Sequence, residues 1–87
     1  MQAAIDDFNQ ALDLDNSIPG ILDGLGQCYH AMKMHDEALE NYNAALDKFM
    51  EKNNKKPNVE FLKNRSATYY DLKNYDESAA DLDTALL

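Results

Sequence analysis

Residues 19–52 of this 87-residue chain read PGILDGLGQCYHAMKMHDEALENYNAALDKFMEK, and their pattern decides the fold. Apolar residues recur three or four positions apart, which is the period of an α-helix rather than of a strand. Pro19 suits the first position of a helix, where its missing N–H would have had no partner. The stretch therefore predicts two helices, over about 19–33 and 36–53, joined by a short turn.

The second helix of this stretch has a copy on each side of it. Ala38, Tyr42 and Ala45 share one helical face, and their small-large-small pattern recurs 34 residues earlier and 40 residues later. The two copies are Ala4, Phe8 and Ala11, and Ser78, Leu82 and Ala85. The first helix and its own copy carry Leu22, Leu25, Gly26 and Tyr29, and Leu62, Arg65, Ser66 and Tyr69. Such self-similarity predicts an array of helical repeats.

The extra residues before the third copy fall at 53–58, where Asn, Lys and Pro are typical of a loop. Asn58 and Asn74 suit the position just before a helix, and Glu77, three residues after Asn74, suggests a capping box. Together these signals predict helices over about 2–15, 19–33, 36–53, 59–72 and 75–87.

These residues resemble the tetratricopeptide repeat, a 34-residue helix-turn-helix unit with Leu-Gly, Tyr, Ala, an aromatic residue and Ala at set positions. The resemblance implies an all-α fold, a right-handed α-solenoid of antiparallel helix pairs with about five helices and roughly two and a half repeats. An unrelated three- or four-helix bundle is the alternative, but it would not require the repeat offset. The division implied for the single segment 1–87 is a second helix at 1–18, a complete repeat at 19–52, an insertion at 53–58 and a nearly complete repeat at 59–87.

In such a repeat, small residues let two helices approach and large rings fill the space beside them. The residues expected to pack in this way are Ala4, Phe8, Ala11, Leu22, Leu25, Gly26, Tyr29, Ala38, Tyr42, Ala45, Leu62, Ser66, Tyr69, Ser78, Leu82 and Ala85. Arg65 replaces the family's Leu, and we expect its stem to lie on apolar surface with its head in water.

Both end helices are expected to keep an uncovered apolar side, because solenoid units bury their faces on neighbours. The residues concerned are Ile5, Phe8 and Leu12 in the first helix, and Leu82, Leu86 and Leu87 in the last. The chain is therefore expected to be a segment of a longer repeat protein, or to pair with another chain through these ends.

The composition excludes several classes of function. Sixteen acidic against eight basic residues give a net charge of -8, which would repel nucleic acid. No apolar run approaches the roughly 18 residues of a membrane span and no secretory signal is visible, so we expect a cytoplasmic protein without membrane insertion. Cys28 is the single cysteine, which excludes an internal disulfide and a cysteine-rich zinc site.

Members of the resembled family commonly bind extended peptides or helices in a concave groove lined by the first helix of each repeat. By position, and with every residue expected to be exposed, the lining would be Gly20, Asp23, Gly24, Gln27, His30, Glu60, Lys63, Asn64, Ala67, Tyr70 and Asp71. An ordinary solvated helix face would look the same for any one of these residues.

One use of such a groove is a clamp for the acidic tails of chaperones, built from Lys, Asn and Arg side chains. Here only Lys63 and Asn64 fit, and three nearby carboxylates would repel an acidic tail. Gly20 and Gly24 lie one turn apart, which suits either close approach of a partner or simple tolerance of glycine. The basic cluster of 52–56 is either a solvated loop or a dock for an acidic partner.

Metal binding, cofactors and catalysis are not expected. Cys28, His30 and His35 would diverge around one helix at their spacing, whereas zinc needs convergent ligands. The sequence has no calcium loop, no phosphate-binding loop and no nucleophile beside a base. The sequence therefore predicts a non-catalytic module that binds other proteins or peptides, as a scaffold segment of a larger assembly. A co-chaperone-type receptor for peptide tails is the alternative, and an enzyme is the alternative from another class.

Overall fold

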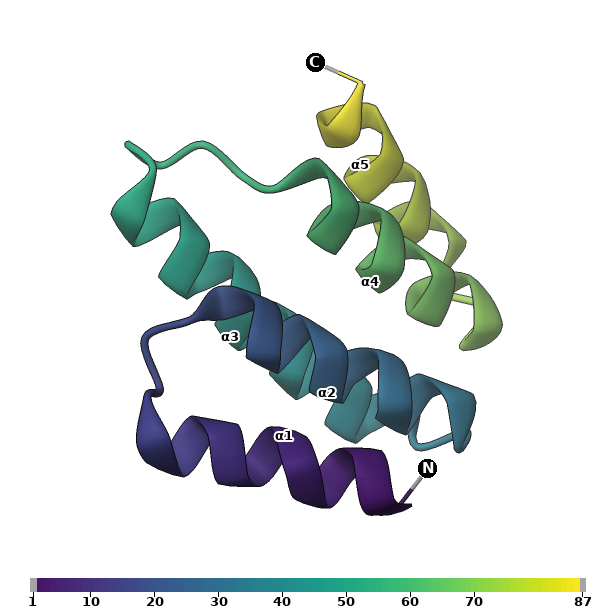
Figure 1. The fold of residues 1–87 in the computed structure, drawn as a ribbon. Helices are drawn as coiled ribbons and strands as arrows, with labels where there is room; N and C mark the ends of the chain where they lie inside the picture. The colour runs from purple at the N-terminus through teal and green to yellow at the C-terminus, as the bar shows by residue number, and fades with distance from the viewer. Residues whose placement is uncertain (1, 87) are drawn as a thin grey trace.

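A computed structural model describes residues 2–86 and forms five helices and no strand within that range (Figure 1). The helices are α1 (Gln2–Leu14), α2 (Pro19–Ala31), α3 (His35–Lys52), α4 (Val59–Asp71) and α5 (Tyr75–Ala85). Every described boundary lies within two residues of the predicted one, and the all-α class is confirmed. Met1 and Leu87, the ends of the predicted segment, lie outside the described residues. Within the described range, no helix combines the length and the hydrophobicity needed to cross a membrane.

The three predicted helix starts fall where expected, but only one of the two predicted asparagine caps forms. Pro19 is at the beginning of α2, and the Asn58 side chain accepts a hydrogen bond from the Phe61 backbone N–H at 3.1 Å. The capping box at Asn74 is wrong, because its side chain makes no capping hydrogen bond with the described residues. The Asn74 backbone N–H already donates to the carbonyl oxygen of Tyr69 at 2.8 Å, so it is not available to Glu77.

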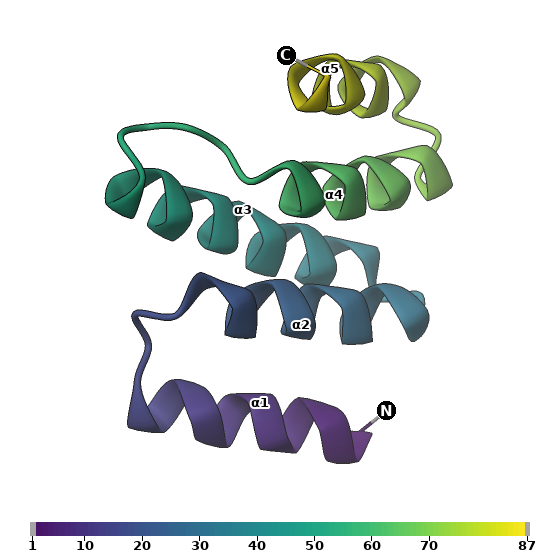
Figure 2. The same cartoon turned by 45° about the horizontal axis from the view of Figure 1, so that its top comes forward.

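The helices stack in chain order, each roughly antiparallel to the next (Figure 2). Helix α1 contacts α2 alone among the described helices, whereas α2 and α4 contact each other across the repeat boundary. The rings of Phe49 on α3 and Phe61 on α4 meet edge to face, with their centroids 5.7 Å apart. The buried core consists of Ile5, Leu22, Leu25, Cys28, Ala45, Leu46, Phe61 and Leu62. Helices α2 and α4 thus share one core and lie side by side.

Close packing of α2 on α3 depends on Gly26. A Cβ atom at this position would lie 2.5 Å from Cε1 of Tyr42, a distance that side-chain atoms do not tolerate. Tyr42 is only 1% exposed, so its ring has little room to move aside. The contact explains why the repeat pattern places glycine opposite an aromatic ring.

Most residues assigned a packing role are buried or half-buried. Those that are buried are Leu22, Leu25, Gly26, Ala38, Tyr42, Ala45, Leu62, Ser66 and Ser78, and those that are half-buried are Ala4, Phe8, Ala11, Tyr29, Tyr69 and Ala85. Leu82 is the exception, and its assignment is wrong: its side chain is 44% exposed on a side of α5 that no described helix covers.

The apolar side of α1 is better covered than expected. Ile5 is 3% exposed, and Phe8 and Leu12 pack against the same core, so the prediction that these three residues lie uncovered is wrong. Helix α2 alone covers them, through Gly24: a Cβ there would lie 2.5 Å from Cζ of Phe8. Leu82 and Leu86, by contrast, are 44% and 85% exposed, as expected for the apolar side of the last helix.

The expectation that the head of Arg65 lies in water is also wrong. Its Nε and Nη2 atoms donate to the two carboxylate oxygens of Asp81 at 2.8 and 2.6 Å, and its Nη1 donates to Asn43 at 2.8 Å. The two guanidinium nitrogens and both carboxylate oxygens thus form a bidentate ion pair at the α4–α5 interface. This pair is largely buried, since the Asp81 side chain is only 8% exposed. The hydrogen bonds to Asp81 raise the pKa of Arg65 above its ordinary value.

Replacing Gly26 with Ala should lower the free energy of unfolding by about 1–3 kcal/mol, because the new methyl group would displace the Tyr42 ring. The matched control is Gly20→Ala in the same helix, where a Cβ meets no described atom within 4 Å. That control should be neutral or stabilise by up to about 1 kcal/mol. Urea denaturation measures both variants, and equal losses would contradict the proposed role of Gly26.

Asp81→Ala should destabilise the fold by about 3 kcal/mol, because it leaves the half-buried Arg65 guanidinium without its partner. The double variant Arg65→Leu with Asp81→Leu should recover most of that loss, since it removes both charges. Asp83→Ala, at an exposed position of the same helix, serves as the control and should change stability by less than about 0.5 kcal/mol. If Asp81→Ala lowers the free energy of unfolding no more than Asp83→Ala does, the Arg65–Asp81 ion pair contributes nothing to stability.

Candidate partner-binding groove

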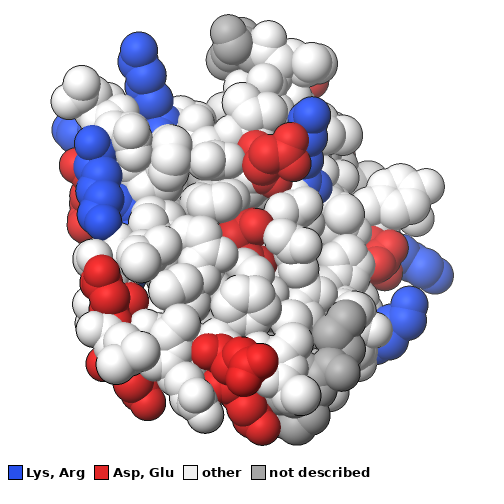
Figure 3. All heavy atoms as spheres, viewed as in Figure 1, with Lys and Arg blue, Asp and Glu red and all other residues white. Residues whose placement is uncertain are grey.

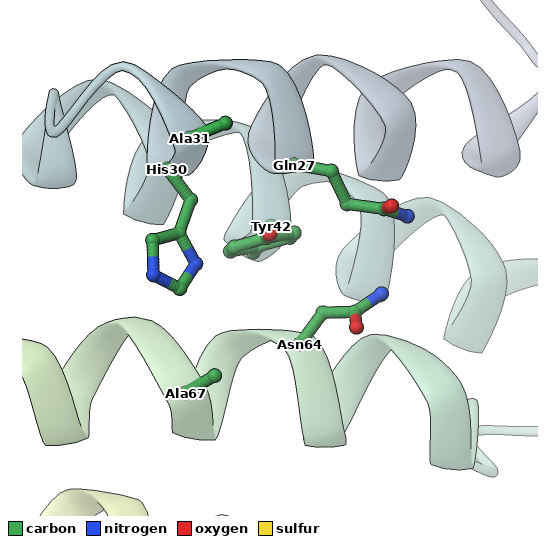
Figure 4. Close-up of a pocket in the computed structure, with 6 residues that line it drawn as sticks. All are labelled: Gln27, His30, Ala31, Tyr42, Asn64 and Ala67. Carbon is green, nitrogen blue, oxygen red and sulfur yellow. The ribbon is translucent and has the colours of Figure 1, made fainter.

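The face where α2 and α4 run side by side contains an open pocket of about 360 Å³ (Figure 4). The pocket is lined by Gln27, His30, Ala31, Tyr42, Asn64 and Ala67. The sequence predicted four of these residues from their position in the repeat and missed Ala31 and Tyr42. Tyr42 reaches the pocket from α3 behind, between the two lining helices (Figure 4). Its position in the repeat predicted a packing role, and the ring both packs against Gly26 and lines the pocket.

A carboxylate at the base of this face joins the two helices. Asp23 on α2 accepts a hydrogen bond from Nε2 of Gln27 at 2.8 Å, and both of its oxygens lie 3.1 Å from Nδ2 of Asn64 on α4. The prediction that Asp23 is exposed is wrong, since the residue is only 7% exposed. Its neighbours enclose it because α2 and α4 approach across the repeat boundary at this point.

Burial raises the pKa of the Asp23 carboxyl above its ordinary value. The hydrogen bonds from Asn64 and Gln27 act in the opposite direction, and the charge of Glu60 adds to the rise. Burial also raises the pKa of Tyr42 to about 12, with a second contribution from the nearby Asp23 charge. The Tyr42 ring thus lies near a carboxylate that is held by neutral amide donors.

His30 lies at one end of the pocket, with a partner on each ring nitrogen. Its Nε2 lies 2.6 Å from Oδ2 of Asp71, and its Nδ1 lies 3.1 Å from the hydroxyl of Thr68. The hydrogen bond with His30 lowers the pKa of Asp71, and the charges of His30, Lys33 and His35 lower it further. His30 thus joins the last turn of α2 to the last turn of α4.

The structure also overturns the argument that His30 and His35 diverge. That argument placed both residues on one helix, but α2 ends at Ala31 and the chain turns before α3 begins at His35. The two imidazole rings are 5.7 Å apart as a result. Cys28 is buried in the core, so it does not join them.

The remaining predicted groove residues lie outside the pocket. Gly20 is exposed, but Gly24 packs against Phe8, so the close approach at Gly24 is made by α1 of the same chain. Glu60 and Lys63 are exposed on α4 and form a loose pair at 4.0 Å. Tyr70 is 62% exposed, and its ring meets that of Tyr75, with the centroids 5.2 Å apart.

A family model described as "Tetratricopeptide repeat" matches residues 20–47. Residues 20–47 are thus similar to a tetratricopeptide repeat. The matched residues cover α2 up to its end and much of α3, so they include four residues of the pocket lining: Gln27, His30, Ala31 and Tyr42. No curated protein matches the chain. Proteins with tetratricopeptide repeats are in general non-enzymatic modules that bind other proteins or peptides.

On the face that contains the groove, charged side chains stand among many uncharged ones (Figure 3). Carboxylates lie across the middle and the lower part of the face, and most Lys and Arg side chains stand nearer its edges (Figure 3). Of the basic cluster at 52–56, Lys52 is already engaged, because its amine donates to the backbone carbonyl of Ser17. That contact fastens the loop after α1 to the end of α3, so Lys52 serves the fold.

The pH dependence of stability should report the burial of Asp23. Because its folded-state pKa is raised, the stability it contributes is complete below its unfolded-state pKa of about 3.9 and is lost as the pH rises through the folded-state value. The free energy of unfolding of Asp23→Asn, relative to the unmodified chain, should therefore increase as the pH rises above about 4. Urea denaturation at a series of pH values tests this. A difference that is constant with pH, or that falls, would contradict the burial of an ionisable Asp23.

Proposed function

We propose that the groove between α2 and α4 binds an extended, basic segment of a partner protein, and that the chain serves as a scaffold segment in a larger assembly. The observation that carries this proposal is the pocket lined by both helices, with the rigid Tyr42 ring behind it. A preformed apolar surface flanked by amides offers a peptide both contact area and hydrogen bonds. It also requires little ordering of the receptor when the peptide binds.

The charge around the groove favours a basic partner. Asp71 lies at one end of the pocket, and Glu60 lies near Asp23 on the other side. Lys63 is the basic residue predicted to line the groove, and it is loosely paired with Glu60. Opposite charge on a partner would speed its association and suppress acidic competitors.

The co-chaperone alternative is less well supported by the same contacts. A clamp for a tail carboxylate needs unoccupied donors, but the Asn64 amide already donates to the Asp23 carboxylate. A second carboxylate brought to this position would face the charge of Asp23 without an intervening cation. We therefore place acidic tails among the ligands that this groove rejects.

Selection from a displayed library of random peptides tests the proposal. The selected peptides should be enriched in Lys and Arg. The variant Ala67→Leu, whose side chain fills the pocket, should weaken their binding by at least about tenfold, or about 1.4 kcal/mol. Ala79→Leu, at an exposed position of α5, is the matched control and should leave their affinity unchanged. Fluorescence anisotropy measures the affinity of labelled peptides for the unmodified chain and for both variants.

Two results would overturn the proposal. Peptides that bind Ala67→Leu as tightly as the unmodified chain would place the binding surface elsewhere. Micromolar binding of an acidic C-terminal pentapeptide, lost on changing Lys63 and Asn64 to Ala, would establish the co-chaperone alternative instead.

A further inference from the structure

Three metal-ligating side chains converge where two turns of the chain meet. His30 is in the last turn of α2, His35 is the first residue of α3, and Asp71 is the last residue of α4. Each offers one ligand atom, and these three atoms all lie within 4.8 Å of one another. The Oδ2 atom of Asp71 is 2.6 Å from Nε2 of His30 and 3.9 Å from Nε2 of His35. We propose that these three residues bind a zinc ion.

The donor set fits zinc better than it fits a hard cation. Zinc binds imidazole nitrogen at about 2.0–2.1 Å and carboxylate oxygen at about 2.0–2.2 Å, so its ligand atoms in a tetrahedral site are about 3.3–3.5 Å apart. The separations of 2.6 and 3.9 Å from Oδ2 of Asp71 lie on both sides of this value, so the side chains must adjust to reach it. The Asp71 side chain is 42% exposed and is free to make that adjustment. Calcium and magnesium, which prefer several oxygen ligands, would find one carboxylate here.

Two further contacts suit a metal site. Zinc-bound histidines almost always donate their second ring N–H to a neighbouring acceptor, which fixes the tautomer. The Thr68 hydroxyl lies 3.1 Å from Nδ1 of His30 and is completely buried, so it can hold Nδ1–H while Nε2 faces the metal. The Nε2 atom of His35 is buried and has no hydrogen-bond partner among residues 2–86, which an ion would supply.

The local charge is compatible with such a site. Two neutral imidazoles and the Asp71 carboxylate would reduce the charge of the ion from +2 to +1. Lys33 lies close enough to influence Asp71 and would oppose the ion, but a chain with a net charge of -8 favours cations overall. Three protein ligands leave the fourth position of the tetrahedron for water.

The bound ion would couple the repeats. His30 and His35 flank the turn between α2 and α3, and Asp71 ends α4 of the next repeat. An ion held by all three would fix the separation of α2 and α4 at the end of the pocket where His30 lies. This inference does not depend on the proposed peptide ligand, since it rests on the cluster alone.

Titration of the full chain with Co²⁺, followed by its visible absorption and by displacement with Zn²⁺, tests the proposal. One equivalent of Co²⁺ should produce the intense bands of a tetrahedral ion with nitrogen ligands, and one equivalent of Zn²⁺ should abolish them. The imidazole resonances of both histidines should shift with the same stoichiometry in NMR spectra. Mg²⁺ at the same concentration should shift neither histidine.

Single-residue variants distinguish binding by the three proposed ligands from weak attraction of Zn²⁺ to the acidic surface. His30→Asn, His35→Asn and Asp71→Asn should each weaken Zn²⁺ binding by at least about tenfold, and Thr68→Val should weaken it by about tenfold. Asp83→Asn makes the same change of charge as Asp71→Asn at an exposed position of α5 and should leave the affinity unchanged. Circular dichroism establishes that each variant is folded.

Three outcomes would overturn the proposal. Octahedral Co²⁺ bands, or unshifted histidine resonances at saturating Zn²⁺, would mean that His30 and Asp71 form an ion pair only. Equal losses of affinity in Asp71→Asn and Asp83→Asn would indicate diffuse binding to the acidic surface. Because the absorption and NMR measurements use the unmodified chain, a variant that fails to fold would not prevent the test.

Discussion

The approach of the Tyr42 ring to the bare Cα of Gly26 is the constraint on which the rest of the structure depends. It sets how closely α2 and α3 pack, and it brings an aromatic ring from α3 to the space between α2 and α4. A single large-small contact thus joins the helix pair of one repeat and shapes the surface that it shares with the next. Phe8 and Gly24 repeat the same device one helix earlier, between α1 and α2.

Polar contacts inside the array take over where the apolar pattern of the repeat is interrupted. Asp23 gathers amide donors from two helices, and Arg65 and Asp81 form an ion pair where α4 meets α5. The hydroxyl of Ser78 donates to the backbone carbonyl of Ser66 at 2.9 Å in a buried position. Such groups fix the register between helices, because each of them must keep its partner once it is buried.

The fold could be predicted from the sequence because helix period and repeat offset depend only on residue type and spacing. Pro19, Asn58 and the recurring Ala, Tyr and Phe positions were sufficient for the five helices. Most of the errors concern contacts between residues distant in sequence, whereas the missing cap at Asn74 is local. The burial of Asp23 depends on Asn64, 41 positions away, and the partner of Arg65 lies on another helix.

The candidate site was predictable to a similar extent. Position within the repeat located Gln27, His30, Asn64 and Ala67 on one surface, because neighbouring repeats present equivalent positions to the same side. It could not show that the chain reverses between His30 and His35 and brings both rings near Asp71. That outcome depends on the turn between α2 and α3, whereas the metal argument treated His30 and His35 as if they lay on one helix.

The hydrogen bonds between Asp23 and Asn64 have a consequence for folding cooperativity. In repeat arrays, stability is approximately the sum of the intrinsic stabilities of the repeats and the interface terms between neighbours. Asp23 belongs to one repeat and Asn64 to the next, so opening either repeat alone would break these hydrogen bonds. Any partly unfolded state that separates α2 from α4 loses these bonds together with the shared apolar core of the two helices. The two repeats should therefore melt as one unit, with no stable intermediate in which only one of them is ordered.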